Sequence, residues 1–195
     1  MERKNATLPR TQWEDVKPAP GGLALVQRFV NTRNNLSGGD LLADAEEATA
    51  WLTGYGLLGA GERIGERERE RLVEFREALR SLLSANNEVP GADAQALNDF
   101  IKSVDLRVRF GSDGRLGLES APGGGVVERT VGSLLAETVR AEAEGRWGRL
   151  KACSNEECRW AFYDASKNHS GRWCTMQVCG ARHKMRAYRE RKSES

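Results

Sequence analysis

Four cysteines in the last quarter of the chain form two pairs with the same spacing. Cys153 and Cys158 end one C-x4-C segment, Cys174 and Cys179 end another, and fifteen residues separate the pairs. Each pair could fold into a tight knuckle that presents two thiolates, and two knuckles supply the four ligands of a tetrahedral zinc ion. Because four thiolates leave no position for water, the pattern predicts a structural Zn²⁺ site rather than a catalytic one.

Two other uses of these thiols stay open at the level of sequence. Two disulfides would need the same residues. However, the N-terminal segment is charged and lacks the apolar stretch of an export signal, which favours the cytoplasm, where cysteines stay reduced. A redox switch that releases zinc on oxidation would need them too. Bound metal would explain how roughly 45 residues fold, since so short a segment buries too little apolar surface by itself.

Aromatic side chains between the cysteine pairs have two interpretations. They could form a small core around the metal, which we favour, or they could stack on nucleobases. The rings concerned are Trp160, Phe162, Tyr163 and Trp173.

Positive charge is concentrated in the same part of the chain. Residues 151–195 contain ten Lys and Arg against five Asp and Glu, so they carry +5, and the remaining 150 residues carry −3 of the overall +2. The stretch after Cys179 has no proline and shows helical spacing, which predicts a basic helix. Such a helix could contact phosphates, or it could be a solvated end whose charges serve solubility. The candidate nucleic-acid contacts are Arg182, Lys184, Arg186, Arg189 and Arg191.

The rest of the chain predicts a mostly helical domain over residues 23–148, after an irregular lead-in over residues 1–22. Apolar residues recur at helical spacing in 41–52, 62–85, 94–104 and 126–144, with Asp40 and Asp93 as expected caps. Between them, residues 104–118 alternate apolar and polar side chains around a turn at 111–114, which predicts a hairpin. A polar patch of Asn31, Thr32 and Arg33 could line a ligand pocket or form a turn.

Several classes of function are disfavoured. The chain has no apolar stretch long enough for a bilayer, so we expect no membrane partner. It also has no glycine-rich phosphate loop, nucleophile elbow or paired metal-binding histidines, so we expect no enzyme.

The C-terminal segment resembles the CGNR zinc-finger family of bacterial proteins. The similarity is carried by the two cysteine pairs, by Trp-Ala-Phe-Tyr-Asp-Ala-Ser-Lys-Asn at 160–168 and by the residues from Arg172 to Lys184. The preceding part is similar to the putative stress-induced transcription regulator domain, through the segments at 23–32, 40–42, 51–52 and 56–58. One residue departs from the family: Ala181 replaces the signature asparagine, which could have capped the following helix.

The sequence therefore predicts a mainly α-helical fold with a small antiparallel β-hairpin. A C-terminal finger over residues 149–195 would consist of two cysteine knuckles and a basic helix. The resemblance implies a zinc-binding transcription regulator of the bacterial cytoplasm that binds nucleic acid, and we favour duplex DNA. RNA binding and a zinc-stapled adaptor for other proteins are the alternatives. A homo-oligomer and a small-molecule effector are left open.

Overall fold

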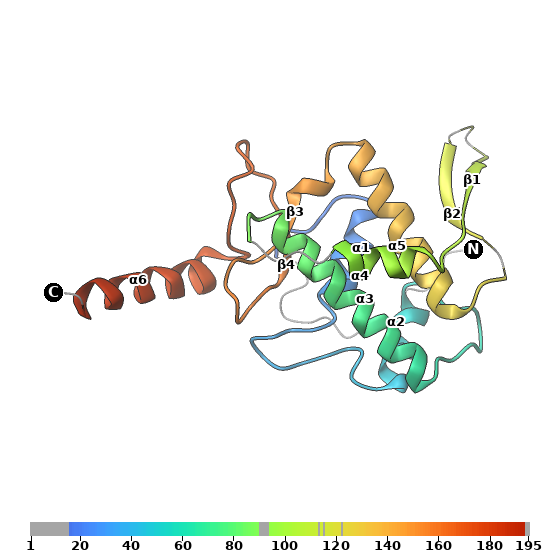
Figure 1. Cartoon of the computed structure of the whole chain (residues 1–195), viewed down its shortest axis with the longest axis horizontal. Coiled ribbons are helices and arrows are strands. Elements are labelled where there is room, and N and C mark those ends of the chain that lie inside the picture. Colours follow the sequence, from blue (N-terminus) through green and yellow to red (C-terminus); the bar gives the residue numbers. More distant parts are fainter. Residues whose placement is uncertain (1–15, 90–93, 113, 115, 122, 194–195) are drawn as a thin grey trace, which may run out of the picture.

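The computed structural model describes residues 16–89, 94–112, 114, 116–121 and 123–193. The described residues form six α-helices and two pairs of antiparallel strands (Figure 1). The helices are α1 (Leu23–Val30), α2 (Ala45–Gly54), α3 (Glu66–Ala85), α4 (Ala94–Ile101), α5 (Val126–Ala143) and α6 (Ala181–Ser193). The strands are β1 (Leu106–Phe110), β2 (Leu116–Ser120), β3 (Leu150–Ala152) and β4 (Ala161–Tyr163). The first fifteen residues of the expected lead-in and the expected cap Asp93 lie outside the described residues.

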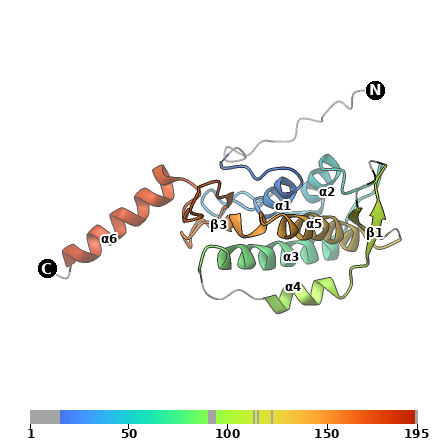
Figure 2. The same cartoon turned by 90° about the horizontal axis from the view of Figure 1, so that it is seen from above.

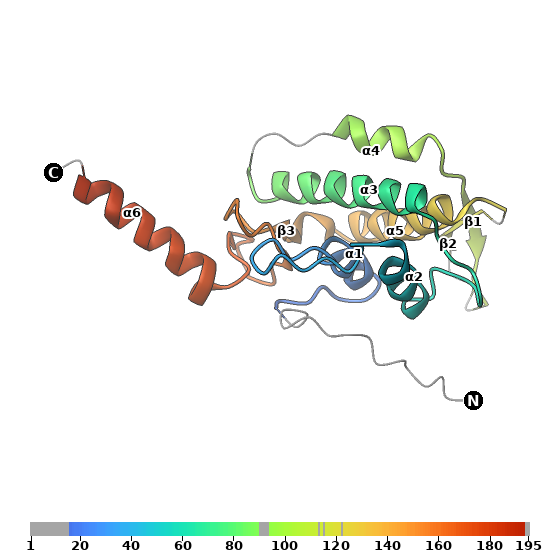
Figure 3. The ribbon, with the colours of Figure 1, turned by 90° about the horizontal axis from the view of Figure 1, so that it is seen from below.

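The helices before residue 145 pack in layers around α3. Figures 2 and 3 show α3 between α4 on one side and α5 and α1 on the other. Aromatic rings fill the centre: Phe29 of α1 lies 5.8 Å from Trp51 of α2 and 6.0 Å from Phe75 of α3, measured between ring centroids. All three rings are buried, so the apolar stripes found in the sequence do face one another. The expected helical class of fold is confirmed.

The start of α2 differs from the expectation. Asp40 was the predicted cap, but Asp44 caps the helix, and its Oδ1 accepts hydrogen bonds from the backbone N–H groups of Glu46 and Glu47. Asp40 instead lies four residues before the cap, where its two carboxylate oxygens accept hydrogen bonds at 2.6 and 3.0 Å from the guanidinium of Arg76. Asp40 is therefore engaged by a buried arginine and does not cap α2.

Two arginines of α3 are buried, although charged residues on an amphipathic helix usually face solvent. Arg76 is 2% exposed and Arg80 is fully buried. Arg80 donates to the backbone oxygens of Val30, at 2.6 Å, and of Arg159, at 3.0 Å, and it pairs with Glu77. These hydrogen bonds offset the cost of burying the guanidinium, and they connect α3 with the cysteine-bearing segment.

The predicted hairpin is present as β1 and β2, with Val108 opposite Leu118 and Phe110 opposite Leu116. It stands at one end of the molecule against α5 (Figure 1). Gly132 of α5 permits this close approach, because a Cβ atom there would lie 2.8 Å from the side-chain oxygen of Ser120.

The second strand pair was not predicted. β3 and β4 pair antiparallel on either side of the first cysteine pair, with Ala152 opposite Ala161. Leu150, Ala152 and Ala161 are fully buried in the same apolar core as α1, α3 and α5. The segment that carries the first two cysteines is therefore packed directly onto the helices.

The last helix, α6, points away from the rest of the molecule (Figures 1 and 2). None of its residues is buried, and even Met185 and Tyr188 are 53% and 57% exposed. Among the described residues, no helix is both long enough and apolar enough to cross a membrane.

Candidate metal centre and basic helix

The four cysteines converge on one point at the base of α6. The sulfur of Cys174 lies 3.7 Å from that of Cys158 and 3.7 Å from that of Cys179, and all four sulfurs lie within 4.8 Å of one another. All four are free thiols and are buried. Around a tetrahedral zinc ion with Zn–S bonds of about 2.3 Å, neighbouring sulfurs are about 3.8 Å apart, so this arrangement fits that ion.

The first knuckle is built around Asn155. Its backbone oxygen accepts hydrogen bonds from the N–H groups of Cys158, at 2.8 Å, and Arg159, at 3.0 Å. Arg159 takes a left-handed backbone conformation with φ of 49°, which reverses the chain into β4. The N–H of Cys153 then donates to the oxygen of Trp160 at 2.9 Å. These bonds hold the sulfurs of Cys153 and Cys158 on the same side of the turn.

The second knuckle is formed by a π-helical turn over Met176–Gly180 that leads directly into α6. Thr175 caps this turn, since its Oγ1 accepts from the N–H of Val178 and its backbone oxygen accepts from the N–H of Gly180. Cys179 therefore lies within the wound turn that starts the helix. The direction of α6 is fixed by the same backbone that presents Cys174 and Cys179.

Asn155 also contacts the metal centre through its side chain, a contact that the sequence did not reveal. Its Nδ2 lies 3.7 Å from the sulfur of Cys179, and the residue is 3% exposed. Hydrogen bonds of this kind orient metal ligands and tune their basicity. The only signal in the sequence is a turn-forming asparagine between two cysteines, which by itself is not specific.

The thiols strongly influence one another's pKa. Hydrogen bonds from Cys158 and Cys174 lower the pKa of Cys153. The hydrogen bond to Cys153, followed by the one to Cys174 and by burial, raises the pKa of Cys158, and the contact with Cys153 also raises the pKa of Cys174. One thiolate therefore suppresses ionisation of its neighbours when no cation is present. A divalent cation would reverse this, because it stabilises all of the thiolates.

A buried ion pair organises the loop between the knuckles. Nζ of Lys151 on β3 lies 3.2 Å from Oδ2 of Asp164, which also accepts from the N–H of Gly171 at 2.7 Å. Burial alone would raise the pKa of Asp164, but hydrogen bonds from Ser166, Gly171 and Lys151 hold that pKa well below its ordinary value. The same ammonium group donates to the backbone oxygen of His169. The ion pair between Lys151 and Asp164 therefore stabilises this loop in addition to the expected metal.

Amide side chains of the helical part hold the cysteine-bearing segment in place. The side-chain amide of Asn31 makes two hydrogen bonds with the backbone of Ala161. Oδ1 of Asn31 accepts from the N–H of Ala161 at 2.8 Å, and Nδ2 donates to the backbone oxygen of Ala161 at 2.9 Å. Gln27 donates to the same oxygen. Asn87, two residues after the end of α3, donates to the backbone oxygens of Ala152 and Arg172 at 2.8 and 3.0 Å. On β4, side chains thus satisfy both backbone groups of Ala161, and the backbone oxygen of Lys17 accepts from the N–H of Tyr163 at 2.9 Å.

The residues proposed for a ligand pocket lie in this contact region. Asn31 and Thr32 are buried, and Thr32 Oγ1 donates to the oxygen of Phe29 and accepts from Arg76. Nη1 of Arg33 lies 3.5 Å from Oδ2 of Asp40. All three have partners within the protein, and the ligand pocket stays a prediction.

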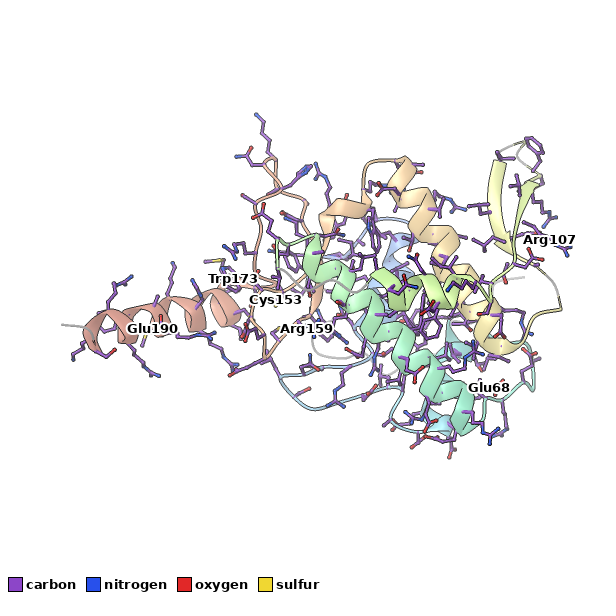
Figure 4. The ribbon with its side chains drawn as sticks, in the orientation of Figure 1. Glu68, Arg107, Cys153, Arg159, Trp173 and Glu190 are labelled. Atoms are coloured by element: carbon purple, nitrogen blue, oxygen red, sulfur yellow. The ribbon has the colours of Figure 1, made fainter. Side chains whose placement is uncertain are left out.

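The aromatic rings near the cysteines differ in their surroundings. Trp160 and Phe162 are buried and pack with the four cysteines, as expected for a core around the metal. Trp173 is half-buried and stacks on His183 of α6, with 4.9 Å between ring centroids. Tyr163 packs instead against the core of the helical part. Figure 4 shows Cys153, Arg159 and Trp173 together at the base of α6, with Glu190 farther out on that helix.

The basic side chains of α6 lie on two faces. Arg182, Arg186 and Arg189 line a hollow of about 680 Å³ at the base of the helix, together with Asn155 and Gln177. At 100° per residue, Lys184 and Arg191 lie on the opposite face. Glu157 lies in the same hollow, with a carboxylate oxygen 3.6 Å from Nη1 of Arg182. The structure brings the three arginines together beside the knuckles and leaves the other two cations apart from them.

Two family models match the chain, and both agree with the resemblance found in the sequence. Residues 149–192 match the CGNR zinc finger, and residues 23–144 match the putative stress-induced transcription regulator. Neither is a family of enzymes. No curated protein is similar enough in sequence to match the chain. Ala181, which replaces the family's asparagine, is the first residue of α6, and the helix forms without that amide.

Proposed function

Since the chain belongs to the family of putative stress-induced transcription regulators and ends in a CGNR zinc finger, we propose that it is a zinc-dependent regulator that binds duplex DNA through α6. Cys153, Cys158, Cys174 and Cys179 would hold the zinc ion. Bound zinc would supply structural cross-linking and no chemistry on a substrate, because its four positions are filled by sulfur. The proposal includes no catalytic activity and places the protein in the bacterial cytoplasm, where such a regulator acts.

The separation of the sulfurs supports zinc over disulfides. A disulfide requires two sulfurs about 2.05 Å apart. The sulfur of Cys174 lies 3.7 Å from those of Cys158 and Cys179, which is close to the separation expected around tetrahedral zinc. Arg159 and Arg172 lie close to these cysteines in the chain, and their charge would help to offset the net −2 of four thiolates and one Zn²⁺.

The single observation that carries the DNA proposal is that a projecting, mostly exposed cationic helix starts two residues after the candidate metal ligand Cys179. From Arg182 to Lys192 it has six Lys and Arg and one Glu, and it has no packing partner along most of its length. Lys and Arg release counterions from the DNA backbone when they contact phosphates, and an isolated helix fits the major groove. Zinc would keep the first turn rigid, so that the helix enters the groove in one orientation.

The test is the dependence of affinity on salt for a labelled DNA duplex. If Arg186 and Arg189 contact phosphates, the variant Arg186→Gln/Arg189→Gln should lower the slope of log affinity against log salt by about two. The matched control is Arg63→Gln/Arg67→Gln, which removes two exposed charges near the start of α3, at the far end from α6 (Figure 4). Equal slopes for the two double variants would overturn the role of α6.

Two alternatives make different predictions in the same assay. RNA binding would appear as tighter binding to a single-stranded RNA than to duplex DNA, but Trp160 and Phe162 are buried and cannot stack on bases. An adaptor that binds acidic proteins would bind a non-nucleic polyanion such as heparin as tightly as DNA. We propose DNA because α6 offers charge on both faces of one projecting helix, which suits the two walls of a groove.

The helical part would act as the regulatory half of the protein. Asn31, Gln27, Arg80 and Asn87 tie it to the backbone on which the cysteines lie. A small-molecule effector or an oligomeric contact that displaced α1 or α3 would therefore also displace the first knuckle.

A further inference from the structure

Two large apolar side chains are exposed on the basic helix α6. Met185 and Tyr188 are 53% and 57% exposed, although large apolar residues are usually buried. At about 100° per residue they lie about 60° apart around the helix, and the exposed Ala181 falls between them. These three residues form one apolar stripe along α6, and Lys192 ends the stripe about one turn beyond Tyr188.

Both flanks of the apolar stripe are positively charged. Each flank lies roughly a quarter-turn around the helix from the middle of the stripe. One flank consists of Arg182, Arg186 and Arg189, and the other consists of Lys184 and Arg191. Met185 lines the same hollow as the three arginines, which agrees with this order of side chains around the helix. Glu190, the only acidic residue of α6, lies about 170° from the middle of the stripe.

We propose that the apolar stripe faces the floor of the DNA major groove and contacts the C5-methyl groups of thymines. This orientation rests on the proposed binding of duplex DNA by α6, and it assigns the side of the helix that meets the bases. In the major groove the base edges form the floor, and the phosphates of the two strands line the walls. A helix that turns the apolar stripe to the floor presents one row of cations to each wall. Thymine offers a methyl group on that floor, and apolar side chains contact it.

Other orientations of α6 in the groove place its charges unfavourably. If the arginine row faced the floor, Glu190 would lie against the phosphates of one wall and the apolar stripe against those of the other. If Lys184 and Arg191 faced the floor, Glu190 would again lie against a wall. A carboxylate repels phosphates, and apolar side chains offer them no hydrogen bond. With the apolar stripe on the bases, Glu190 points away from the DNA.

The dimensions of α6 fit this placement. An α-helix with its side chains is about 10–12 Å wide, and the major groove is about 12 Å wide. The seven residues from Ala181 to Tyr188 rise about 10.5 Å along the helix axis, which equals about three base-pair steps. We therefore expect a preference for sites with two or more thymines within about four base pairs. Because α6 points away from the rest of the molecule, a duplex can reach the stripe (Figures 1 and 2).

A membrane surface is another class of partner for an apolar stripe between two rows of cations. Helices that lie on membranes bury Trp, Phe or Leu side chains on their apolar face. α6 contains none of these residues, and the apolar stripe has only two large side chains. DNA therefore fits α6 better, and vesicle binding becomes an outcome of the test.

The test replaces thymine by uracil, which removes the C5-methyl group and keeps the base pair. The probes are a labelled duplex of alternating adenine and thymine and the same duplex with uracil at every thymine position. Burial of one methyl group strengthens binding roughly fourfold, so contacts from Met185 and Tyr188 should give the wild type a roughly 10- to 20-fold preference for the thymine duplex. Met185→Ala/Tyr188→Ala should bind both duplexes within about twofold of each other. Its slope of log affinity against log salt should equal that of the wild type, because it removes no charge.

Two control variants separate the apolar contact from charge. Glu190→Ala shortens a side chain on the far side of α6 and should keep the preference for thymine. Arg186→Gln/Arg189→Gln should also keep this preference, with the lower salt slope expected from the loss of phosphate contacts. Circular dichroism and zinc content would verify that each variant is folded, and alanine is the residue most favourable to a helix.

The possible results separate the apolar contact from DNA binding itself. Equal affinity of the wild type for both duplexes, with a salt slope that Arg186→Gln/Arg189→Gln lowers, would overturn the contact and leave DNA binding by α6 intact. A preference for thymine that persists in Met185→Ala/Tyr188→Ala would also overturn it. No binding to either duplex at about 100 μM protein, the weak limit of non-specific affinity, would instead overturn the proposed function. If the wild type then bound vesicles of phosphatidylserine and phosphatidylcholine and Met185→Ala/Tyr188→Ala did not, the apolar stripe would belong to a membrane contact.

Discussion

Replacement of Asn31 by alanine tests how the helical part and the finger are joined. Asn31 is 8% exposed and its amide makes two hydrogen bonds with Ala161, which is fully buried. In Asn31→Ala the N–H of Ala161 loses its partner, while its oxygen keeps the hydrogen bond from Gln27. A buried, unpaired N–H costs about 1–3 kcal/mol, and the lost second bond and the cavity add to this cost. We expect a loss of about 2–4 kcal/mol in the free energy of unfolding.

The assay is urea unfolding of the zinc-loaded protein, followed by circular dichroism for the helices and by tryptophan fluorescence. Because Ala161 lies in the core shared by both parts, we expect both probes to shift together. The matched control is Asn35→Ala, which removes one partly exposed hydrogen bond to the oxygen of Cys158, at 3.2 Å, and should cost less than about 1 kcal/mol.

The outcome distinguishes the two interpretations of Asn31. If it serves mainly to line a ligand pocket, its removal should change stability by less than about 0.5 kcal/mol, as for a typical surface substitution. That result, or a shift confined to the fluorescence of the finger, would refute the reasoning that amide side chains join the two parts.

Three further predictions follow from individual contacts. Asn155→Ala should weaken zinc binding about 10–100-fold in competition with a chelator, because Cys179 loses the hydrogen bond to its sulfur, and an unchanged affinity would argue against that contact. Asp40→Asn should destabilise the protein by about 2 kcal/mol at pH 7, because the buried Arg76 loses one of its two carboxylate partners and keeps only Glu77. Arg76 holds the pKa of Asp40 below its ordinary value against the opposing effect of burial. The stability that this carboxylate contributes is therefore present above its unfolded pKa of about 3.9 and is lost as the pH falls through the folded pKa. The difference in unfolding free energy between wild type and variant should be constant from pH 7 to 5 and smaller at pH 3. A difference at pH 3 equal to that at pH 7 would contradict the assignment. Removal of zinc by a chelator should reduce the helical circular dichroism signal by more than the contribution of α6, because Leu150, Ala152 and Ala161 belong to the common core. A loss of signal no larger than the contribution of α6 would show that the two parts fold separately.

The sequence predicted those features that depend on local spacing. Two cysteine pairs, the apolar stripes of α3 and α5 and the alternation in β1 and β2 are each encoded within a few residues. Their positions agree with the structure within a few residues at each end. The convergence of the four sulfurs also followed from spacing, because a tetrahedral metal site allows few arrangements of two knuckles.

The contacts between the two parts could not be predicted in the same way. Arg80 and Arg159 are 79 residues apart, and Asn31 and Ala161 are 130 residues apart, so no local pattern relates them. Arg76 and Arg80 follow the usual pattern of charged residues on a solvated face, and only the tertiary structure shows that backbone oxygens and Asp40 surround them.

This packing changes one consequence of metal loss. From sequence alone, we expect Cys174→Ser to unfold residues 151–195 while the other helices persist. The structure places β3 and β4 in the core of those helices, so the same change should also destabilise α1 and α3.

The zinc content of the purified protein tests the central claim most directly. Elemental analysis of wild type purified without added zinc should give one zinc per chain, and Cys174→Ser, which removes one of the four sulfurs, should give far less. A wild type that contains no zinc would contradict the account, and so would a Cys174→Ser variant that keeps one zinc per chain.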